Sequence, residues 1–180
     1  MPKTEDILLL ADVIKYLKRL DPKHMAWVVS SLLNILCFYE VAGLTHNGLT
    51  VDTVFISPQF HSAFPLGGWW YAARVKSPLK FLPPAVHKVA PADIVASKIA
   101  GNRIDLACVR AIAREAIGDP TGSRLQVTPD IPKPLADWLR LPPARKAVDD
   151  YENWQRVLKD SFGPRRFLKL DIDPSAIYEV

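Results

Sequence analysis

The segment from Asp21 to Gly43 limits the possible folds of this 180-residue chain more than any other segment. It begins with Asp21-Pro22, a capping residue followed by proline at the first helical position, and it ends at Gly43, a residue type common after helix ends. Apolar side chains occupy nearly every face of the helix between them: Trp27, Val28, Leu32, Leu33, Ile35, Leu36 and Phe38. Such a helix has to be covered on all sides, so the segment predicts a central helix within a domain.

The same segment does not predict a membrane span. Asn34 and Glu40 interrupt its apolar run, and a span needs about 20 clean apolar residues. The amino terminus shows no signal-peptide pattern. Cys37 and Cys108 lie in apolar runs, which predicts buried free thiols and a reducing compartment. We therefore expect a cytoplasmic protein that has no membrane partner.

Capping and turn residues divide the rest of the chain into short elements. Thr4 is a plausible N-cap, and apolar residues at helical spacing from Ile7 predict a first helix that ends near Leu20. Two apolar runs, 49–56 and 64–73, predict the strands of a small hairpin.

Prolines disfavour regular structure over residues 74–92, where we expect a long ordered loop. Helical periodicity then returns in four stretches, at 92–100, 105–117, 134–140 and 147–162. The predicted fold class is mainly α with a small β-hairpin. It forms one domain, residues 1–163, followed by a C-terminal tail, residues 164–180.

The sequence around His46 resembles the catalytic loop of protein kinases. The chain reads Val41-Ala42-Gly43-Leu44-Thr45-His46-Asn47-Gly48-Leu49-Thr50, and three apolar residues follow at Val54-Phe55-Ile56. His46 and Leu49 match the family pattern His-Arg-Asp-Leu-Lys-x-x-Asn. The predicted order of elements also resembles the carboxy-terminal lobe of that family. The resemblance implies that His46 is a structural residue packed beneath the loop.

The resemblance also implies that the catalytic residues are missing. Gly48 stands at the catalytic Asp, Thr50 at the usual Lys and Thr53 at the metal-binding Asn. The run 66–72 resembles the region of the Asp-Phe-Gly motif, with Gly68 in place of the metal-binding Asp. Glycine can neither accept the substrate proton nor hold magnesium. The resemblance therefore implies no catalytic residue, no metal site, no cofactor and no ATP binding.

Further matches extend this resemblance. Leu82-Pro83-Pro84-Ala85 is similar to the Ala-Pro-Glu motif, with Ala85 in place of a glutamate that forms a buried ion pair in the family. Asp105 and Asp93 both fit the structural Asp that braces the catalytic loop, and the spacing does not decide between them. The Trp-Trp-Tyr-Ala segment and residues 162–167 resemble kinase-like proteins encoded by bacteria and their phages.

The family's amino-terminal lobe is not recognisable in the sequence. No Gly-rich phosphate loop and no Val-Ala-x-Lys strand precede Thr4. Two explanations stay open: the chain is a piece of a longer protein, or it is a natural half-length kinase-like protein.

Two groups of residues are candidate binding sites. Trp69, Trp70 and Tyr71 suit a protein interface, since aromatic residues are enriched at interface hot spots, although they could equally belong to the core. On a strand, Trp69 and Tyr71 would share one face and Trp70 would take the other. Arg165 and Arg166 suit phosphate groups. The apolar residues that follow them instead predict docking on the chain's own domain or on a partner: Phe167, Leu168 and Leu170.

The remaining polar candidates are weaker. His24, His61 and His87 show no metal-type spacing. Asp52 is the one carboxylate close to the predicted catalytic loop, and we interpret it as a turn residue.

Charge and motifs together give one functional hypothesis and two alternatives. The net charge of +4 comes mostly from scattered residues. A solvated helix face explains the local cluster of Lys15, Lys18 and Arg19. We expect a catalytically inactive, pseudokinase-like scaffolding module with an unknown protein partner. The alternatives are an unusual phosphotransferase completed by another chain, with Asp52 and Thr53 holding the metal, and a helical adaptor with a basic surface for nucleic acid.

Overall fold

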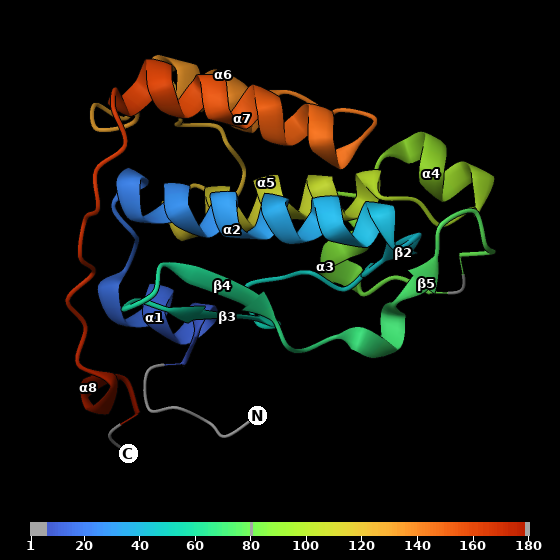
Figure 1. Cartoon of the computed structure of the whole chain (residues 1–180), viewed down its shortest axis with the longest axis horizontal. Coiled ribbons are helices and arrows are strands. Elements are labelled where there is room, and N and C mark those ends of the chain that lie inside the picture. The colour runs from blue at the N-terminus through green and yellow to red at the C-terminus, as the bar shows by residue number, and fades with distance from the viewer. Residues whose placement is uncertain (1–6, 80, 179–180) are drawn as a thin grey trace.

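The computed structural model describes residues 7–79 and 81–178, and it is mainly helical with a small antiparallel sheet (Figure 1). The helices are α1 (Leu10–Leu17), α2 (Pro22–Val41), α3 (Pro84–His87), α4 (Ala92–Ser97), α5 (Arg103–Ala116), α6 (Lys133–Arg140), α7 (Ala147–Phe162), α8 (Pro174–Tyr178) and the 3₁₀ helix η1 (Trp69–Tyr71). The strands are β1 (Leu8–Leu9), β2 (Leu44–Thr45), β3 (Val54–Ser57), β4 (Ser62–Pro65) and β5 (Ala73–Arg74). The predicted class, mainly α with a small β component, is confirmed.

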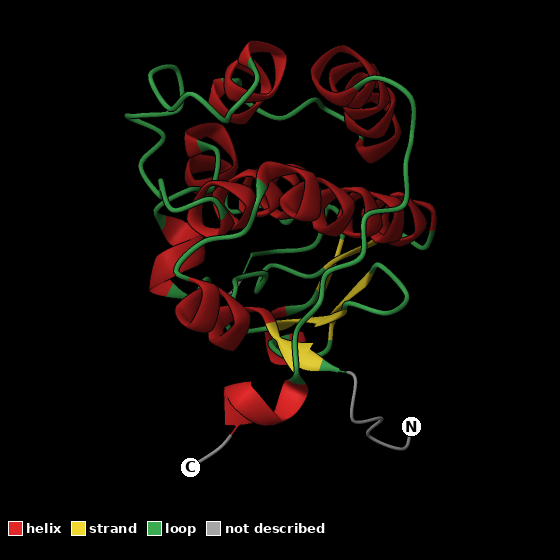
Figure 2. Cartoon of the chain, turned by 90° about the vertical axis from the view of Figure 1, so that its left-hand side faces the viewer, coloured by secondary structure: helices red, strands yellow, loops and turns green. Residues whose placement is uncertain are grey.

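The central helix predicted from the sequence is α2. The Asp21 side chain accepts a hydrogen bond from the Lys23 backbone nitrogen at 2.8 Å, which caps the first turn. Figures 1 and 2 show α2 and α5 in a middle layer, with α6 and α7 on one side and the sheet with α1 on the other. This position explains most of the apolar residues of α2, because both neighbouring layers pack against it. Phe38, which was expected to be covered, is exposed near the end of the helix, as is Val41.

Within the described residues, α2 is the one helix that is long and apolar enough to cross a membrane by length and composition. Residues along its whole length are buried, from Met25 near its start to Tyr39 near its end. Its strongest contacts are with α5, α7 and β4 of the same chain. The helix therefore packs as the core helix of this fold.

The sheet extends the predicted hairpin by one strand. Its order is β1-β3-β4, all antiparallel, with Leu8 opposite Ile56 and Phe55 opposite Phe64. The prediction that the first helix begins before Leu10 is wrong, because Leu8 and Leu9 pair with β3. The proposed cap Thr4 lies outside the described residues. The second hairpin strand begins at Ser62 and ends at Pro65, earlier than predicted.

The segment Trp69–Tyr71 is the 3₁₀ helix η1 and not the predicted strand. Gly68 precedes it at φ 76°, a left-handed conformation that glycine adopts at little cost and that turns the chain out of the sheet. The predicted alternation of Trp69 and Tyr71 against Trp70 is therefore wrong. None of the three side chains is buried.

Residues 74–92 contain more regular structure than their prolines suggest. Arg74 ends β5, which pairs with β2. Pro84 opens the short helix α3, since proline fits the first helical position, where no intrahelical N–H bond is lost. The other described residues before α4, 75–79, 81–83 and 88–91, form an ordered loop, as predicted.

A buried ion pair fastens the α5 layer to the α7 layer. The Arg110 guanidinium makes two 2.6 Å hydrogen bonds to the Asp150 carboxylate, and both side chains are almost fully buried. The guanidinium also lies 4.1 Å from the ring centre of Trp138 in α6. Three helices therefore meet at one charged contact in the core.

The C-terminal tail docks on its own domain. It leaves α7, runs down one side of the molecule and ends in α8 beneath α1 (Figure 1). Leu170 is buried, and the Phe167 ring stacks on His61 with centroids 4.1 Å apart. The Tyr178 hydroxyl accepts a hydrogen bond from the Leu9 nitrogen at 2.9 Å. The docking predicted from Phe167 and Leu170 is therefore made to the chain itself.

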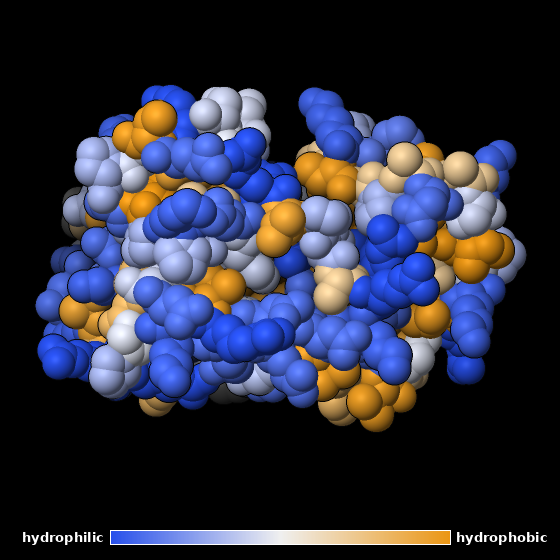
Figure 3. Space-filling model, turned by 90° about the horizontal axis from the view of Figure 1, so that it is seen from above, coloured by the Kyte–Doolittle hydropathy of each residue, from blue (hydrophilic) through white to orange (hydrophobic). Residues whose placement is uncertain are grey.

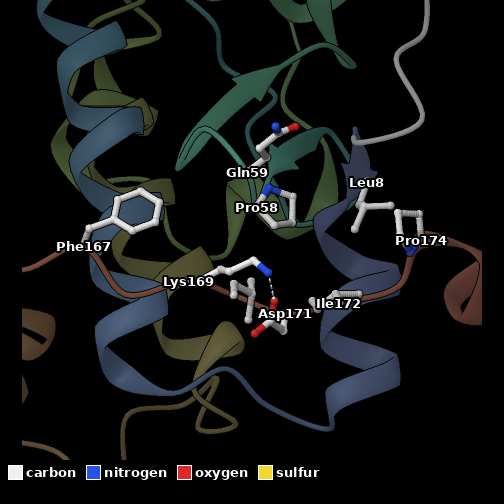
Figure 4. A pocket seen from close by; sticks show the side chains of 9 residues that line it. Leu8, Pro58, Gln59, Phe167, Lys169, Asp171, Ile172 and Pro174 are labelled. Atoms are coloured by element: carbon white, nitrogen blue, oxygen red, sulfur yellow. Dashed lines mark ion pairs between the residues drawn. The ribbon is translucent and has the colours of Figure 1, made fainter.

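A cavity of about 430 Å³ lies between the tail and the sheet. Leu8, Pro58 and Ile172 supply apolar walls. The charged groups that line it among the described residues, Lys169 and Asp171, pair with each other at 2.5 Å (Figure 4). The face made by α6 and α7, seen from above in Figure 3, is mostly hydrophilic with separate hydrophobic patches.

Candidate functional site

The candidate site is built around the loop that follows β2, and Asp105 holds this loop in place. One carboxylate oxygen accepts hydrogen bonds from the Thr45 hydroxyl at 2.8 Å and from the His46 nitrogen at 2.6 Å. The other accepts from the Asn47 nitrogen at 2.7 Å. All four residues are buried. Asp93, the other aspartate considered for this role, instead pairs with Arg103 at the surface.

Burial raises the pKa of the Asp105 carboxyl to about 6, and its three hydrogen bonds oppose that shift. The carboxylate is therefore ionised at neutral pH and acts as a fixed acceptor for the loop. Such an arrangement makes the loop rigid, because releasing it would leave a buried charge without partners.

His46 lies beneath the loop as a neutral side chain. Burial lowers the pKa of its imidazole to about 4. Its Nδ1 accepts a hydrogen bond from the Gly48 nitrogen at 3.2 Å, so the ring proton resides on Nε2. The ring also meets the edge of Trp69, with centroids 4.6 Å apart. These contacts give His46 a structural position between the loop and η1.

Gly48 and Gly68 lie against each other. A Cβ on Gly48 would meet Tyr71 Cδ2 at 2.8 Å and the Gly68 carbonyl oxygen at 2.9 Å. A Cβ on Gly68 would lie 2.9 Å from the Gly48 carbonyl oxygen. Real Cβ contacts are not this short. The backbone thus fills the space in which side chains at these two positions would otherwise face each other.

Thr50 and Thr53 close the loop by local hydrogen bonds. The Thr53 hydroxyl accepts from the Thr50 nitrogen at 2.9 Å and donates to the Gly48 carbonyl oxygen, also at 2.9 Å. Asp52 is exposed to solvent. The pKa of the Glu115 carboxyl is raised, mainly by burial and secondly by the nearby negative charge of Asp52. Within residues 7–79 and 81–178, no three His, Cys, Asp or Glu side chains gather in a group that could hold a metal.

Trp69 is anchored, whereas Trp70 is presented to solvent. The Trp69 indole donates to the Pro65 carbonyl oxygen at 2.8 Å, and its ring contacts Tyr39 edge-on with centroids 5.5 Å apart. The Trp70 side chain is 78% exposed. Of the three expected interface residues, Trp69 therefore fixes η1, Tyr71 is half-buried and Trp70 is largely exposed.

Two further aromatic residues extend this exposed area. Phe38, near the end of α2, is 69% exposed, and Phe81 is 62% exposed. The ring contacts run from Phe38 through Tyr39 to Trp69, and from Trp70 through Tyr71 to Phe81. We call this set the aromatic surface: the exposed Phe38, Trp69, Trp70 and Phe81, and the half-buried Tyr71.

A groove of about 630 Å³ opens at this surface. Trp70, Tyr71 and Phe81 line it together with Leu79 and Arg74. It lies beside β5, at the end of the molecule where α2 runs into β2 (Figure 1). Among the described residues the lining is mostly apolar with one charged group, Arg74, and such a composition is common in binding sites.

Comparison with known proteins does not identify a family for this chain. No family model matches the chain, and no curated protein matches it.

The other sequence-predicted residues lie away from the groove. Arg165 and Arg166 are exposed on the tail, where Arg165 donates to Gln155. His61 stacks between Trp27 and Phe167, and it has no metal partner among the described residues.

Sequence reasoning did not name three residues of this region: Phe38, Phe81 and Arg74. Phe38 was expected to be covered as part of the apolar central helix. The other two belong to the proline-rich stretch 74–92, which was expected to be a long ordered loop, a kind of loop that often carries function, but which has no periodicity to single out residues. One available signal was the absence of any acidic residue between 53 and 92.

Proposed function

We propose that this chain is a catalytically inactive, pseudokinase-like binding module of the cytoplasm that acts through protein–protein contacts at the aromatic surface. The observation that carries the proposal is the exposure of Trp70 beside a loop that Asp105 holds rigid. Because the neighbouring loop is already rigid, Trp70 loses less conformational entropy when a partner binds. This favours Trp70 as an interface anchor.

The kinase-like part of the proposal rests on the loop and on the order of elements. The resemblance implies a structural Asp that braces the loop, and the buried Asp105, which accepts hydrogen bonds from the His46 and Asn47 nitrogens, supports the proposal. The helices α1 and α2, the hairpin, the loop with α3 and the helices from α4 onward follow the expected order.

The absence of catalysis is supported by the contact between Gly48 and Gly68. A carboxylate at either position requires a Cβ, and each Cβ would clash with the backbone of the other residue. Phosphoryl transfer needs carboxylates that orient the nucleophile and hold magnesium. Thr53 uses its hydroxyl within the loop, so it does not replace them. The two free cysteines agree with a reducing compartment.

The first test is titration of the full chain with magnesium-ATP in a calorimeter. The proposal predicts no binding in the micromolar range. Micromolar binding that requires magnesium would contradict it and would favour the phosphotransferase alternative. The second test, on the aromatic surface itself, compares Trp70→Ala with an equally exposed control.

A further inference from the structure

The chain around the groove is strongly basic. Between residues 53 and 104 the only acidic residue is Asp93, against six basic residues: Arg74, Lys76, Lys80, Lys88, Lys98 and Arg103. Asp93 is already paired with Arg103 at 2.5 Å. In the part of the chain that the structure describes, Arg74, Lys76 and Lys98 pair with no carboxylate.

Backbone pairing places the segments that carry Lys76 and Lys98 side by side, although the two residues are distant in sequence. The Lys76 nitrogen donates to the Ala100 carbonyl oxygen at 2.9 Å, and the Leu79 nitrogen donates to the Lys98 carbonyl oxygen at 2.8 Å. All three cationic side chains are exposed. We call Arg74, Lys76 and Lys98 the basic rim, since Arg74 lines the groove and the other two lie on the adjoining segments.

The interior of the groove suits an apolar side chain. The ring centroids of Trp70 and Tyr71 are 5.7 Å apart, and those of Tyr71 and Phe81 are 6.0 Å apart. Leu79 adds an aliphatic wall. An aromatic pocket beside unpaired cations is complementary to a bulky apolar group with negative charges next to it.

The angles between the rings favour a peptide over a single-stranded nucleic acid. Nucleic-acid strands stack successive bases on exposed aromatic faces. Here the Trp70 and Tyr71 planes are tilted by 54°, and the Tyr71 and Phe81 planes by 33°. Tilted rings enclose a side chain, whereas they offer no parallel faces for a stack.

We propose that the groove binds an acidic peptide segment of a partner protein, with one bulky apolar side chain against Trp70, Tyr71 and Phe81 and carboxylates on the basic rim. This inference rests on the proposed function, because it names the class of partner for the same surface.

The test is selection of a random peptide library, displayed on phage, against the immobilised full chain. Binding of the most enriched peptide is then measured by fluorescence anisotropy. The charge-reversed variant is Arg74→Glu with Lys98→Glu. The matched control, Lys15→Glu with Lys23→Glu, makes the same charge change at exposed positions on α1 and at the opposite end of α2.

The inference predicts enriched peptides that combine Asp or Glu with a bulky apolar residue. Affinity for such a peptide falls by roughly tenfold or more in the rim variant, because like charges then face each other, and it stays unchanged in the control. Enriched peptides that lack acidic residues but lose binding in Trp70→Ala would overturn the inference and leave the proposed function standing. Salt-sensitive binding of an oligo(dT) strand at the same residues, without any enriched peptide, would overturn both.

Discussion

The carbonyl oxygen of Gly48 lies 2.9 Å from the position that a Cβ on Gly68 would occupy. The contact joins the loop after β2 to the turn before η1. It explains both glycines at once, because any side chain at either position would push the two segments apart. Trp69 and Trp70 follow Gly68 directly in the sequence, so this contact also fixes the position of the aromatic surface.

Substitution of Gly48 by alanine tests the contact. Gly48→Ala is expected to lower the free energy of unfolding by about 1–3 kcal/mol, because the new methyl group overlaps Tyr71 and the Gly68 backbone. Gly101→Ala is the control: its Cβ would meet only Ile94 Cδ1, at 3.6 Å, and the expected change is within about 0.5 kcal/mol. Urea unfolding measures both variants, and equal stabilities would refute the close contact.

The two aspartates that the sequence left unresolved should differ in their contribution to stability. Asp105→Asn is expected to cost on the order of 3 kcal/mol, because the amide group turns a donor toward a backbone N–H of the loop. Asp93→Asn removes only an exposed ion pair with Arg103, and the expected loss is below about 1 kcal/mol. A similar small loss in both variants would show that Asp105 does not hold the loop.

The imidazole of His46 should stay neutral at pH values well below 6.5, the ordinary pKa of histidine. Nuclear magnetic resonance of the ring nitrogens is expected to show the Nε2–H tautomer and a pKa near the value of about 4 that burial produces. Because the folded pKa lies below the ordinary value of 6.5, His46 destabilises the fold progressively as pH falls from 6.5 toward 4.

Asp105 changes stability in the opposite direction over part of this range. Its folded pKa of about 6 exceeds the ordinary 3.8, so its contribution to stability grows as pH falls through 6 toward 3.8. Direct observation of the imidazole separates the two groups. A His46 ring that titrates near 6.5 would contradict its buried position.

The buried pair of Arg110 and Asp150 should show strong coupling. Asp150→Ala leaves the Arg110 guanidinium buried without its counter-ion and is expected to cost about 3–5 kcal/mol. Arg110→Met with Asp150→Leu removes both charges and should cost less than the single change. Denaturant unfolding of the two variants checks this. A double variant less stable than Asp150→Ala would contradict this prediction, because it would mean that the lost packing of the two side chains costs more than an unpaired buried charge.

The sequence predicted those parts of the fold whose causes are local. The limits of α2 follow from Asp21-Pro22 at one end and Gly43 at the other, and its apolar faces follow from a helix that is covered on both sides. The short helix at η1 could not be predicted, since it depends on Gly68 turning the chain against Gly48, which is distant in sequence. The helical spacing of Ile7 and Leu10 predicted a helix across Leu8 and Leu9, but the pairing of these two residues with β3 overrides it.

The candidate site was predicted in part. Trp70 was named from its chemistry alone, and the position of His46 came from the resemblance. The basic rim was not predicted, because the segments that carry Lys76 and Lys98 lie side by side only through the backbone pairing of 76–79 with 98–100. Hydrophobic periodicity carries no information on such pairing. The absence of acidic residues between 53 and 92 indicates a basic region but not which of its residues lie close together.

The most direct test of the central claim compares Trp70→Ala with Phe60→Ala by affinity capture from the native source. Trp70 is 78% exposed and Phe60 is 70% exposed, so neither change should alter the free energy of unfolding by more than about 0.5 kcal/mol. Phe60 lies in the turn between β3 and β4, outside the aromatic surface. The account predicts a stoichiometric protein partner with wild type and Phe60→Ala that is lost with Trp70→Ala. A partner retained in full by Trp70→Ala would contradict it.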